Sequence, residues 1–250
     1  SSGQQTNSGT NIATGSTNMQ GSVLDLSGSR NQGATMTLVA TAGDINLTKA
    51  NTSVLDLAKL TAKGRLINDS GVLQAGHYDL QVGALSNSSG TLSQTGNQDF
   101  TLVTTGDINN QAGYIGGKAE QLTINTQGTL NNNQGSIIHS SDTSANNAGN
   151  SATITANTLL NQQGKLVSNG NMTATISNDL DNTQGGIQAE ALQITAGKFT
   201  NLDGQLVSQS GDLQLSATDI VNQGDKAYIQ SAQNLNIQAK RLNNSDKATL

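Results

Sequence analysis

A regularly spaced tripeptide constrains this 250-residue chain more than any other feature of its sequence. An apolar residue, any residue and then asparagine recur in register nine times between residues 66 and 244. The asparagines are Asn68, Asn87, Asn110, Asn132, Asn161, Asn182, Asn201, Asn222 and Asn244. Consecutive members are 19, 23, 22, 29, 21, 19, 21 and 22 residues apart, on average 22. A period of this length is typical of a solenoid, in which each repeat stacks on the previous one.

Each period contains two further apolar pieces. A glycine followed by one or two apolar residues comes after the asparagine, as in Gly164-Lys165-Leu166. An alternating pair comes next, as in Leu192-Gln193-Ile194. Alternation of apolar and polar residues predicts a strand with one buried face. Each period therefore predicts three short strands.

The length of the period limits what these strands can form. Three strands of about four to six residues with their turns fill about 20 residues, which leaves no room for a helix. Two arrangements of the strands remain possible: a meander of hairpins and a coil that stacks on itself. The three pieces keep the same order in every period, which gives no reason for strands to alternate in direction. The pattern therefore favours a parallel β-helix.

Stacking gives the asparagines a structural role. Amide side chains stacked at the inter-strand spacing of about 4.8 Å can hydrogen-bond along a ladder. We therefore expect the nine asparagines to form an internal ladder. A glycine follows most of them three residues later, which predicts a corner with a positive φ or a tight backbone turn. After Asn222 the glycine comes early, at Gly224.

Composition alone suggests disorder, because only 33% of the residues are hydrophobic and 2% are aromatic. The 12% content of charged residues and the regular placement of the aliphatic residues favour a folded repeat instead. Proline is absent, as suits internal strands, and so is cysteine, which excludes disulfides and thiolate metal sites. The net charge of −5 argues against nucleic acid as a partner. No apolar run approaches the roughly 18 residues that cross a bilayer.

The regularity of the repeat divides the chain. Residues 1–22 are of low complexity and predict either a mobile segment or an irregular first coil. Residues 23–65 predict degenerate β-helix turns, and residues 66–250 predict regular turns with a loop insertion at 139–150. Insertions in solenoids form loops on one face. The candidate contact residues in this loop are His139, Asp142, Asn146, Asn147 and Asn150.

Sequence patterns for chemistry are weak. Asp179 and Asp181 lie two residues apart and could be compared with the carboxylate pair of a glycosidase. Asp179, however, occupies a turn position, and Asp181 occupies a position that varies between repeats. Both are therefore expected to be solvated surface acids. His77 and His139 fall in different periods without triad or metal spacing. The Thr-x-Thr segments at 35–37, 153–155 and 173–175 predict no flat threonine array of the kind an ice-binding solenoid needs. No catalytic residue, metal site or cofactor is therefore expected.

The complete repeat reads Gly-x-Leu, Leu-x-Ile and Leu-x-Asn-x-x-Gly, most clearly in residues 180–189 and 199–206. This pattern resembles the haemagglutinin repeats of filamentous haemagglutinin and its relatives, which include the effectors of contact-dependent growth inhibition. The resemblance covers residues 66–244 well and residues 1–65 weakly. It implies a right-handed parallel β-helix, with three short strands in each turn of about 19–23 residues.

The resemblance also implies a function and partners. Such proteins are secreted to the Gram-negative cell surface through an outer-membrane partner, and this repeat forms their shaft. Shaft segments display adhesive, receptor-binding or toxin segments that lie elsewhere. A receptor- or glycan-binding module of the same filament is the alternative, and a carbohydrate-acting enzyme is third. The missing initiator Met and signal peptide suggest an excised piece, whose open strand edges would invite end-to-end association.

Overall fold

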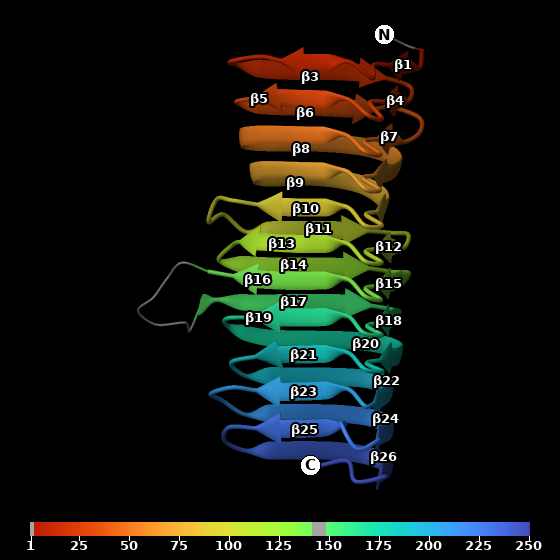
Figure 1. The fold of residues 1–250 in the computed structure, drawn as a ribbon, viewed down its shortest axis with the longest axis vertical. Helices are drawn as coiled ribbons and strands as arrows, with labels where there is room; N and C mark the ends of the chain where they lie inside the picture. The colour runs from red at the N-terminus through yellow and green to blue at the C-terminus, as the bar shows by residue number, and fades with distance from the viewer. Residues whose placement is uncertain (1–2, 142–148) are drawn as a thin grey trace.

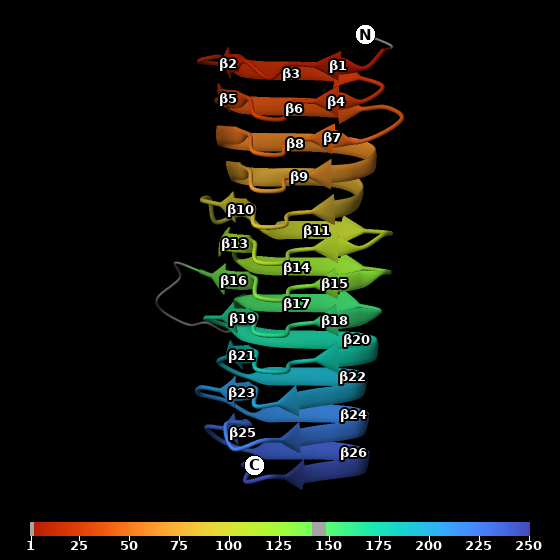
Figure 2. The ribbon, with the colours of Figure 1, turned by 45° about the vertical axis from the view of Figure 1, so that its right-hand side comes forward.

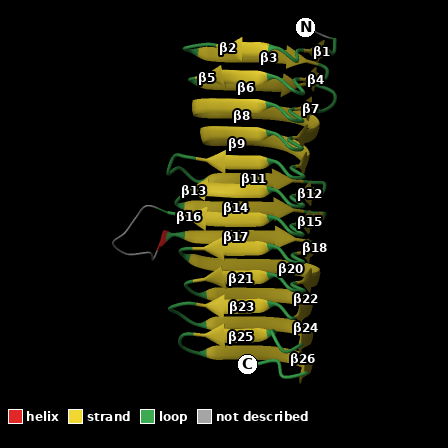
Figure 3. Cartoon of the chain, viewed as in Figure 1, coloured by secondary structure: helices red, strands yellow, loops and turns green. Residues whose placement is uncertain are grey.

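A computed structural model of the chain describes residues 3–141 and 149–250, which form one stack of β-strands (Figure 1). The chain coils through about 11 turns, and each turn adds strands to three parallel sheets. The two termini lie at opposite ends of the stack (Figure 2). Strands dominate the drawn chain, and loops and turns join them at the edges of the stack (Figure 3). The predicted parallel β-solenoid is therefore confirmed.

The three sheets correspond to the three apolar pieces of the repeat. The first sheet holds β2 (Thr10–Ile12), β5 (Arg30–Gly33), β10 (Thr91–Gln94), β13 (Tyr114–Lys118), β16 (Ser136–Ser140), β19 (Lys165–Ser168), β21 (Gly186–Ala189), β23 (Gln205–Ser208) and β25 (Tyr228–Ser231). The second holds β3 (Ser16–Gly21), β6 (Thr35–Ala40), β11 (Phe100–Thr104), β14 (Gln121–Thr126) and β17 (Ser151–Ala156). The third holds β1 (Gln5–Thr6), β4 (Leu24–Asp25), β7 (Ile45–Asn46), β12 (Ile108–Asn109), β15 (Thr129–Asn131) and β18 (Thr158–Leu160).

Six long strands continue around corners and belong to more than one sheet. Strands β8 (Asn51–Ile67) and β9 (Val72–Ser86) run through all three sheets. The other four run through the second and third sheets: β20 (Asn171–Asp181), β22 (Leu192–Leu202), β24 (Leu213–Gln223) and β26 (Leu235–Ser245). The three apolar pieces of one repeat can therefore lie in a single continuous strand or in two strands, and not only in three.

Strands of neighbouring turns pair in parallel. In the first sheet Leu166 pairs with Ile187, and in the second sheet Ile194 pairs with Leu215. A slip by one residue would turn every inward side chain toward solvent. The shared alternation of each turn therefore fixes the register of the stack.

The core consists of aliphatic columns along the axis of the stack. One column of the third sheet has eight consecutive side chains that are at most 2% exposed: Leu66, Leu85, Ile108, Leu130, Leu159, Leu180, Phe199 and Ile220. Burial of one such side chain contributes roughly 1.5–3 kcal/mol. Because each turn repeats this contribution, a thin cylinder with few aromatic residues is stable.

The N-terminal turns follow the same plan with different residues. Strands β1, β2 and β3 pair in parallel with β4, β5 and β6, so residues from Gln5 onward form a first coil. Strands β5, β6 and β7 then pair with successive parts of β8. Within the described residues, no helix is long and apolar enough to cross a membrane.

Candidate functional site

The nine asparagines of the repeat lie in one column at the end of the third sheet. Each Nδ2 donates to Oδ1 of the next asparagine, and the eight links measure 2.7–2.8 Å. The first eight side chains are completely buried. Most amides also reach the backbone; Asn132 Nδ2, for example, donates to Lys165 O at 3.1 Å. The column is thus a continuous hydrogen-bonded ladder that joins nine successive turns.

The glycine that follows these asparagines is required by space and not by its φ angle. The positive φ belongs to the preceding residue, as in Gln163 at 55°, which is not a glycine. A Cβ on Gly164 would overlap the Asn132 carbonyl oxygen and lie 2.5 Å from Asn161 Oδ1. Of the two predicted reasons for the glycine, a positive φ is therefore wrong at Gly164 and holds only after Asn222, where Gly224 has a φ of 106°. The ladder amide and the backbone of the previous turn occupy the space that a side chain would need.

The ladder ends at Asn68, because leucines hold its position in the earlier turns. Leu26 and Leu47 are buried there and offer no donor. Asn68 Oδ1 is consequently buried without a hydrogen-bond partner among the described residues. Ala50 stands where the later turns have glycine, since no amide crowds that site.

A second, shorter polar column occurs in the first sheet of the N-terminal turns. Asn11 Nδ2 donates to Asn31 Oδ1 at 2.8 Å, and Asn31 Nδ2 donates to Thr52 Oγ1 at 3.0 Å. The next turn replaces Thr52 with Leu73 in register. Polar and aliphatic columns thus exchange places between the early and the later turns. The apolar-x-Asn pattern does not predict this column. Its signal in the sequence is an inward polar residue that recurs about once per period, at Asn11, Asn31 and Thr52.

The candidate contact loop is only partly described. Asp142, Asn146 and Asn147 lie outside the described residues. His139 lies in β16 and is 1% exposed, and Asn150 is 5% exposed. Both side chains face the interior, so their assignment to an exposed contact loop is corrected.

His139 is held by hydrogen bonds to the turns before and after its own. Its Nδ1 lies 2.8 Å from Ser168 Oγ, and its Nε2 lies 3.1 Å from Ala119 O. A carbonyl oxygen only accepts, so Nε2 carries the proton and Nδ1 accepts from Ser168. Burial lowers the pKa of His139, although hydrogen bonds to the backbone at Ala119 and Glu120 oppose that shift. His139 is thus a neutral core residue that replaces Gln94, two turns earlier in the same column.

The two carboxylates that could suggest glycosidase chemistry have other partners. Burial raises the pKa of Asp181, but hydrogen bonds from Thr183 and Gln162 outweigh it and hold the pKa below its ordinary value. A general acid needs the opposite shift. Asp179 is exposed and stacks in register beside Lys198. In residues 3–141 and 149–250 no group of three or more His, Asp or Glu side chains could hold a metal ion.

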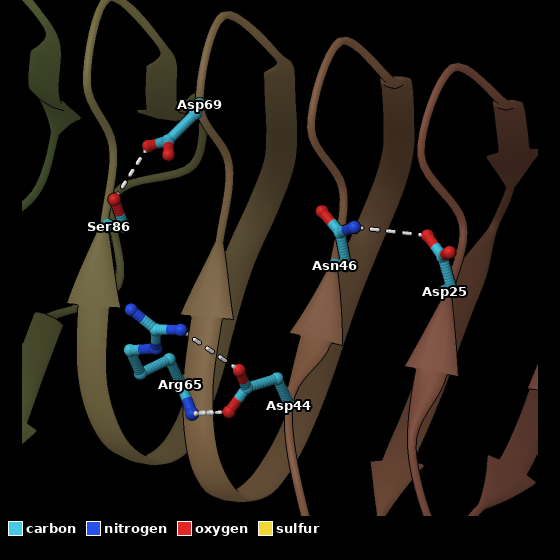
Figure 4. A network of polar contacts seen from close by, with 6 residues as sticks. All are labelled: Asp25, Asp44, Asn46, Arg65, Asp69 and Ser86. Carbon is cyan, nitrogen blue, oxygen red and sulfur yellow. Dashed lines mark hydrogen bonds and ion pairs between the residues drawn. The ribbon is translucent and has the colours of Figure 1, made fainter. Parts of the chain in front are cut away.

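Polar side chains on the outer surface join neighbouring turns (Figure 4). Asn46 Nδ2 donates to Asp25 Oδ1 at 3.0 Å. Arg65 donates through its backbone N to Asp44 Oδ1 at 2.7 Å, and its guanidinium lies 3.4 Å from the other carboxylate oxygen. Such exposed contacts contribute about 0–1 kcal/mol each. They add specificity to the register more than they add stability.

One outer face carries only uncharged polar side chains at two outward positions of each strand. It lies on the second sheet from β14 to β26 and has two columns in register. The first column contains Thr123, Thr153, Thr173, Gln193, Gln214 and Asn236. The second contains Asn125, Thr155, Thr175, Thr195, Ser216 and Gln238. We call these twelve residues the neutral strip.

The neutral strip corrects one expectation from the sequence. Thr153-x-Thr155 and Thr173-x-Thr175 pair in register, so they do occupy successive turns of one face. The insertion before Ser151 precedes both segments, and their spacing of 20 residues matches the period of the repeat, so the sequence did carry a signal for this pair. Amides complete the strip in the later turns, so the array is mixed and not purely threonine.

Comparison with known proteins places this architecture in context. No protein-family model matches the chain, and no solved structure matches it. Toxin CdiA of Yersinia pestis is 32% identical over 249 residues, which is 97% of this chain. The chain spans 7% of the length of that relative. Sequence similarity along nearly the whole chain and the stacked solenoid together confirm its resemblance to a filamentous haemagglutinin-like repeat region of a two-partner-secretion exoprotein.

Proposed function

We propose that this chain is a structural shaft segment of a large secreted filament, an adhesin or a contact-dependent growth inhibition protein. The asparagine ladder carries this proposal, because it joins nine turns without interruption from Asn68 to Asn244. A continuous core and ladder stiffen the stack along its axis. Similarity to a segment of Toxin CdiA supports the same role. The shaft would hold adhesive, receptor-binding or toxin segments away from the cell.

The proposal includes a route and a place. A filament of this kind would leave the cell through an outer-membrane secretion partner and remain on the exterior of a Gram-negative cell. A host or target-cell receptor or glycan would be contacted by the displayed segments. The lowered pKa of Asp181 and the stacking of Asp179 beside Lys198 support a non-enzymatic role for this chain. Turnover of any member of a polysaccharide panel would contradict that role.

Small-angle X-ray scattering tests the shape that a shaft requires. About 11 turns at about 4.8 Å each give a rod of roughly 50 Å. We expect an elongated scattering profile and β-rich circular dichroism. A compact globule or a random coil would contradict the proposal.

Two deletions test whether the turns are interchangeable, as a shaft allows. Deletion of residues 162–182 removes one whole period and joins Asn161 to Thr183, which preserves the register. Deletion of residues 162–172 removes about half a period and breaks it. We expect the first variant to fold as a shorter rod and the second to lose cooperative unfolding. Loss of folding in both variants would mean that a turn carries a unique structural role.

A binding module of the same filament is the second candidate function. The neutral strip favours it, because its polar side chains make no hydrogen bonds within the part of the chain that the structure describes. Deletion of residues 141–149 provides a separate test of the loop insertion. Unchanged binding to target cells after that deletion would direct attention to the strip.

A further inference from the structure

The neutral strip has a hydrogen-bonding capacity that the fold does not use. Its twelve side chains are hydroxyls and amides, and all are at least partly exposed. Within the part of the chain that the structure describes, none of them donates or accepts a side-chain hydrogen bond. Each hydroxyl and amide can both donate and accept. The strip is therefore an ordered array of free donors and acceptors.

Other outer columns use the same residue types differently. Gln163 Nε2 donates to Gln184 Oε1 at 3.0 Å, and Asn131 Nδ2 donates to Asn109 Oδ1 at 3.1 Å. Asn178 likewise donates to Asn157 at 2.9 Å. Stacked amides in this molecule thus bond along the axis where they serve the fold. The lack of such bonds on the strip sets it apart from a stabilising ladder.

The dimensions of the strip limit its ligand. Six turns at about 4.8 Å give a length of roughly 24 Å, while two outward columns lie only about 7 Å apart. A stable protein interface buries about 800 Å² on each partner, more than so narrow a strip offers. One extended polymer chain fits this shape. A shallow hollow of about 390 Å³ beside Thr173, Gln193 and Gln214 offers it a seat.

Charge further narrows the chemistry of the ligand. No Lys or Arg lies within the two columns, so the strip cannot neutralise a sulfated or uronic acid chain. Charged residues stand outside the two columns. Asp212 at the preceding corner lines the hollow and accepts a hydrogen bond from Asn234 Nδ2 at 3.0 Å. At the following corner Lys198 pairs in register with Asp219, and Asp219 with Arg241. Arg241 donates to Asp219 and lowers the pKa of that carboxyl. Arg241 and Asp219 thus neutralise each other.

We infer that the neutral strip binds an extended, uncharged polysaccharide chain by hydrogen bonds to the hydroxyl groups of the sugars. Sugar hydroxyls donate and accept, as the amides and hydroxyls of the strip do. The methyl groups of Thr153, Thr173 and Thr195 supply small apolar surfaces for the carbon faces of the sugar rings. Repetition along the axis lets several weak contacts act on one chain. This inference adds a ligand to the shaft and does not depend on the displayed segments.

Binding to polysaccharides tests the strip against a matched face. The probes are dextran, mannan and xyloglucan, which are uncharged, and heparin, which is highly charged. The test variant is Gln193→Glu with Gln214→Glu, which replaces two amide donors with carboxylates. The control variant is Gln205→Glu with Gln230→Glu, which adds the same charge to exposed positions of the first sheet. Circular dichroism and thermal unfolding verify that both variants fold.

The expected result is binding to at least one uncharged polysaccharide that weakens about tenfold or more in the test variant and less than about threefold in the control. No binding of the wild-type chain to any uncharged probe would overturn the inference, as would binding to heparin alone. Equal weakening in both variants would attribute the effect to net charge and overturn it as well. Self-association that only the test variant abolishes, without polysaccharide binding, would assign the strip to a second copy instead. A rod-shaped scattering profile in any of these cases leaves the shaft proposal intact.

Discussion

Asn161 illustrates why an amide occupies the ladder position. Its Oδ1 accepts from Asn132 Nδ2 at 2.7 Å, and its Nδ2 donates to Asn182 Oδ1 at 2.8 Å. A carboxylate would lack the donor and would bury a charge, and a hydroxyl is too short to reach both neighbours. Only a short amide extends the chain of hydrogen bonds in both directions.

The ladder predicts a difference between an internal and a terminal asparagine. Asn161→Ala leaves Asn182 Oδ1 buried without its donor. Asn68→Ala likewise leaves Asn87 Oδ1 without its donor, but it also removes Asn68 Oδ1, a buried acceptor that already lacks a partner. An unsatisfied buried group costs about 1–3 kcal/mol. We therefore expect Asn161→Ala to lower the free energy of unfolding by about 1–3 kcal/mol more than Asn68→Ala. Chemical denaturation measures both, and equal losses would contradict the ladder as an energetic unit.

His139 predicts a dependence of stability on pH. Burial lowers its pKa below the ordinary value of 6.5. As pH falls through 6.5 the unfolded chain therefore binds the proton first, and stability is lost until the folded-state pKa is passed. His139→Gln keeps a donor for Ala119 O, as Gln94 does for Lys118 O at 3.0 Å, but cannot titrate.

The measurement compares wild type and His139→Gln by denaturation at about pH 7.5 and about pH 5. We expect the wild type to lose more stability than the variant over this range. The carboxylates titrate in both proteins, so the difference between them isolates His139. Parallel curves would show that His139 keeps its ordinary pKa in the fold.

At the scale of the element, the turn after each ladder asparagine is shaped by contact between turns. Gly164→Ala would drive a Cβ into the backbone of Asn132, which cannot move without breaking the ladder. Gly186 has no atom within 4 Å of its ideal Cβ, and it lies in β21 of the next turn. The two glycines are therefore a matched pair that differ in surroundings.

We expect Gly164→Ala to destabilise the protein by about 3 kcal/mol or more and Gly186→Ala to change stability by less than about 0.5 kcal/mol. Thermal unfolding measured by circular dichroism distinguishes the two. A neutral Gly164→Ala would show that the turn has room to move, and close approach would then not explain the repeated glycine.

The strands show which structural features the sequence pattern predicted and which it did not. Alternation predicted the inward residues of the strands, because one face of each strand is buried whatever the partner. It did not predict that β20, β22 and β24 continue around a corner, since that depends on the backbone between two faces. It also placed His139 in a loop, because the irregular spacing after Asn132 begins near that residue while β16 extends to Ser140.

The whole molecule is a one-dimensional stack in which each turn contacts mainly its neighbours. In such a stack the stability is approximately a sum of the turns and their interfaces. Substitutions in distant turns should therefore act independently, while substitutions in adjacent turns share a hydrogen bond.

A pair of double variants tests this additivity. Asn87→Ala with Asn201→Ala removes two distant members of the ladder, and Asn161→Ala with Asn182→Ala removes two that share a hydrogen bond of 2.8 Å. We expect the first pair to be additive within about 0.5 kcal/mol and the second to deviate by more than that, because the shared bond is lost only once. Denaturation of the single and double variants gives both coupling energies. Strong coupling in the distant pair would mean that the ladder acts as one unit along the rod.

The sequence by itself determined the period, the inward residues and the nine positions of the asparagine ladder, because in-register stacking repeats the same residue at the same place in every turn. Only the tertiary structure decided why glycine follows the asparagine, where the ladder ends, and that Gln193 and Gln214 join the threonines on one neutral face. Those properties depend on atoms of neighbouring turns that lie about one period away along the chain. Spacing along the chain cannot report them, since insertions change the number of residues in a turn without changing the rise between turns.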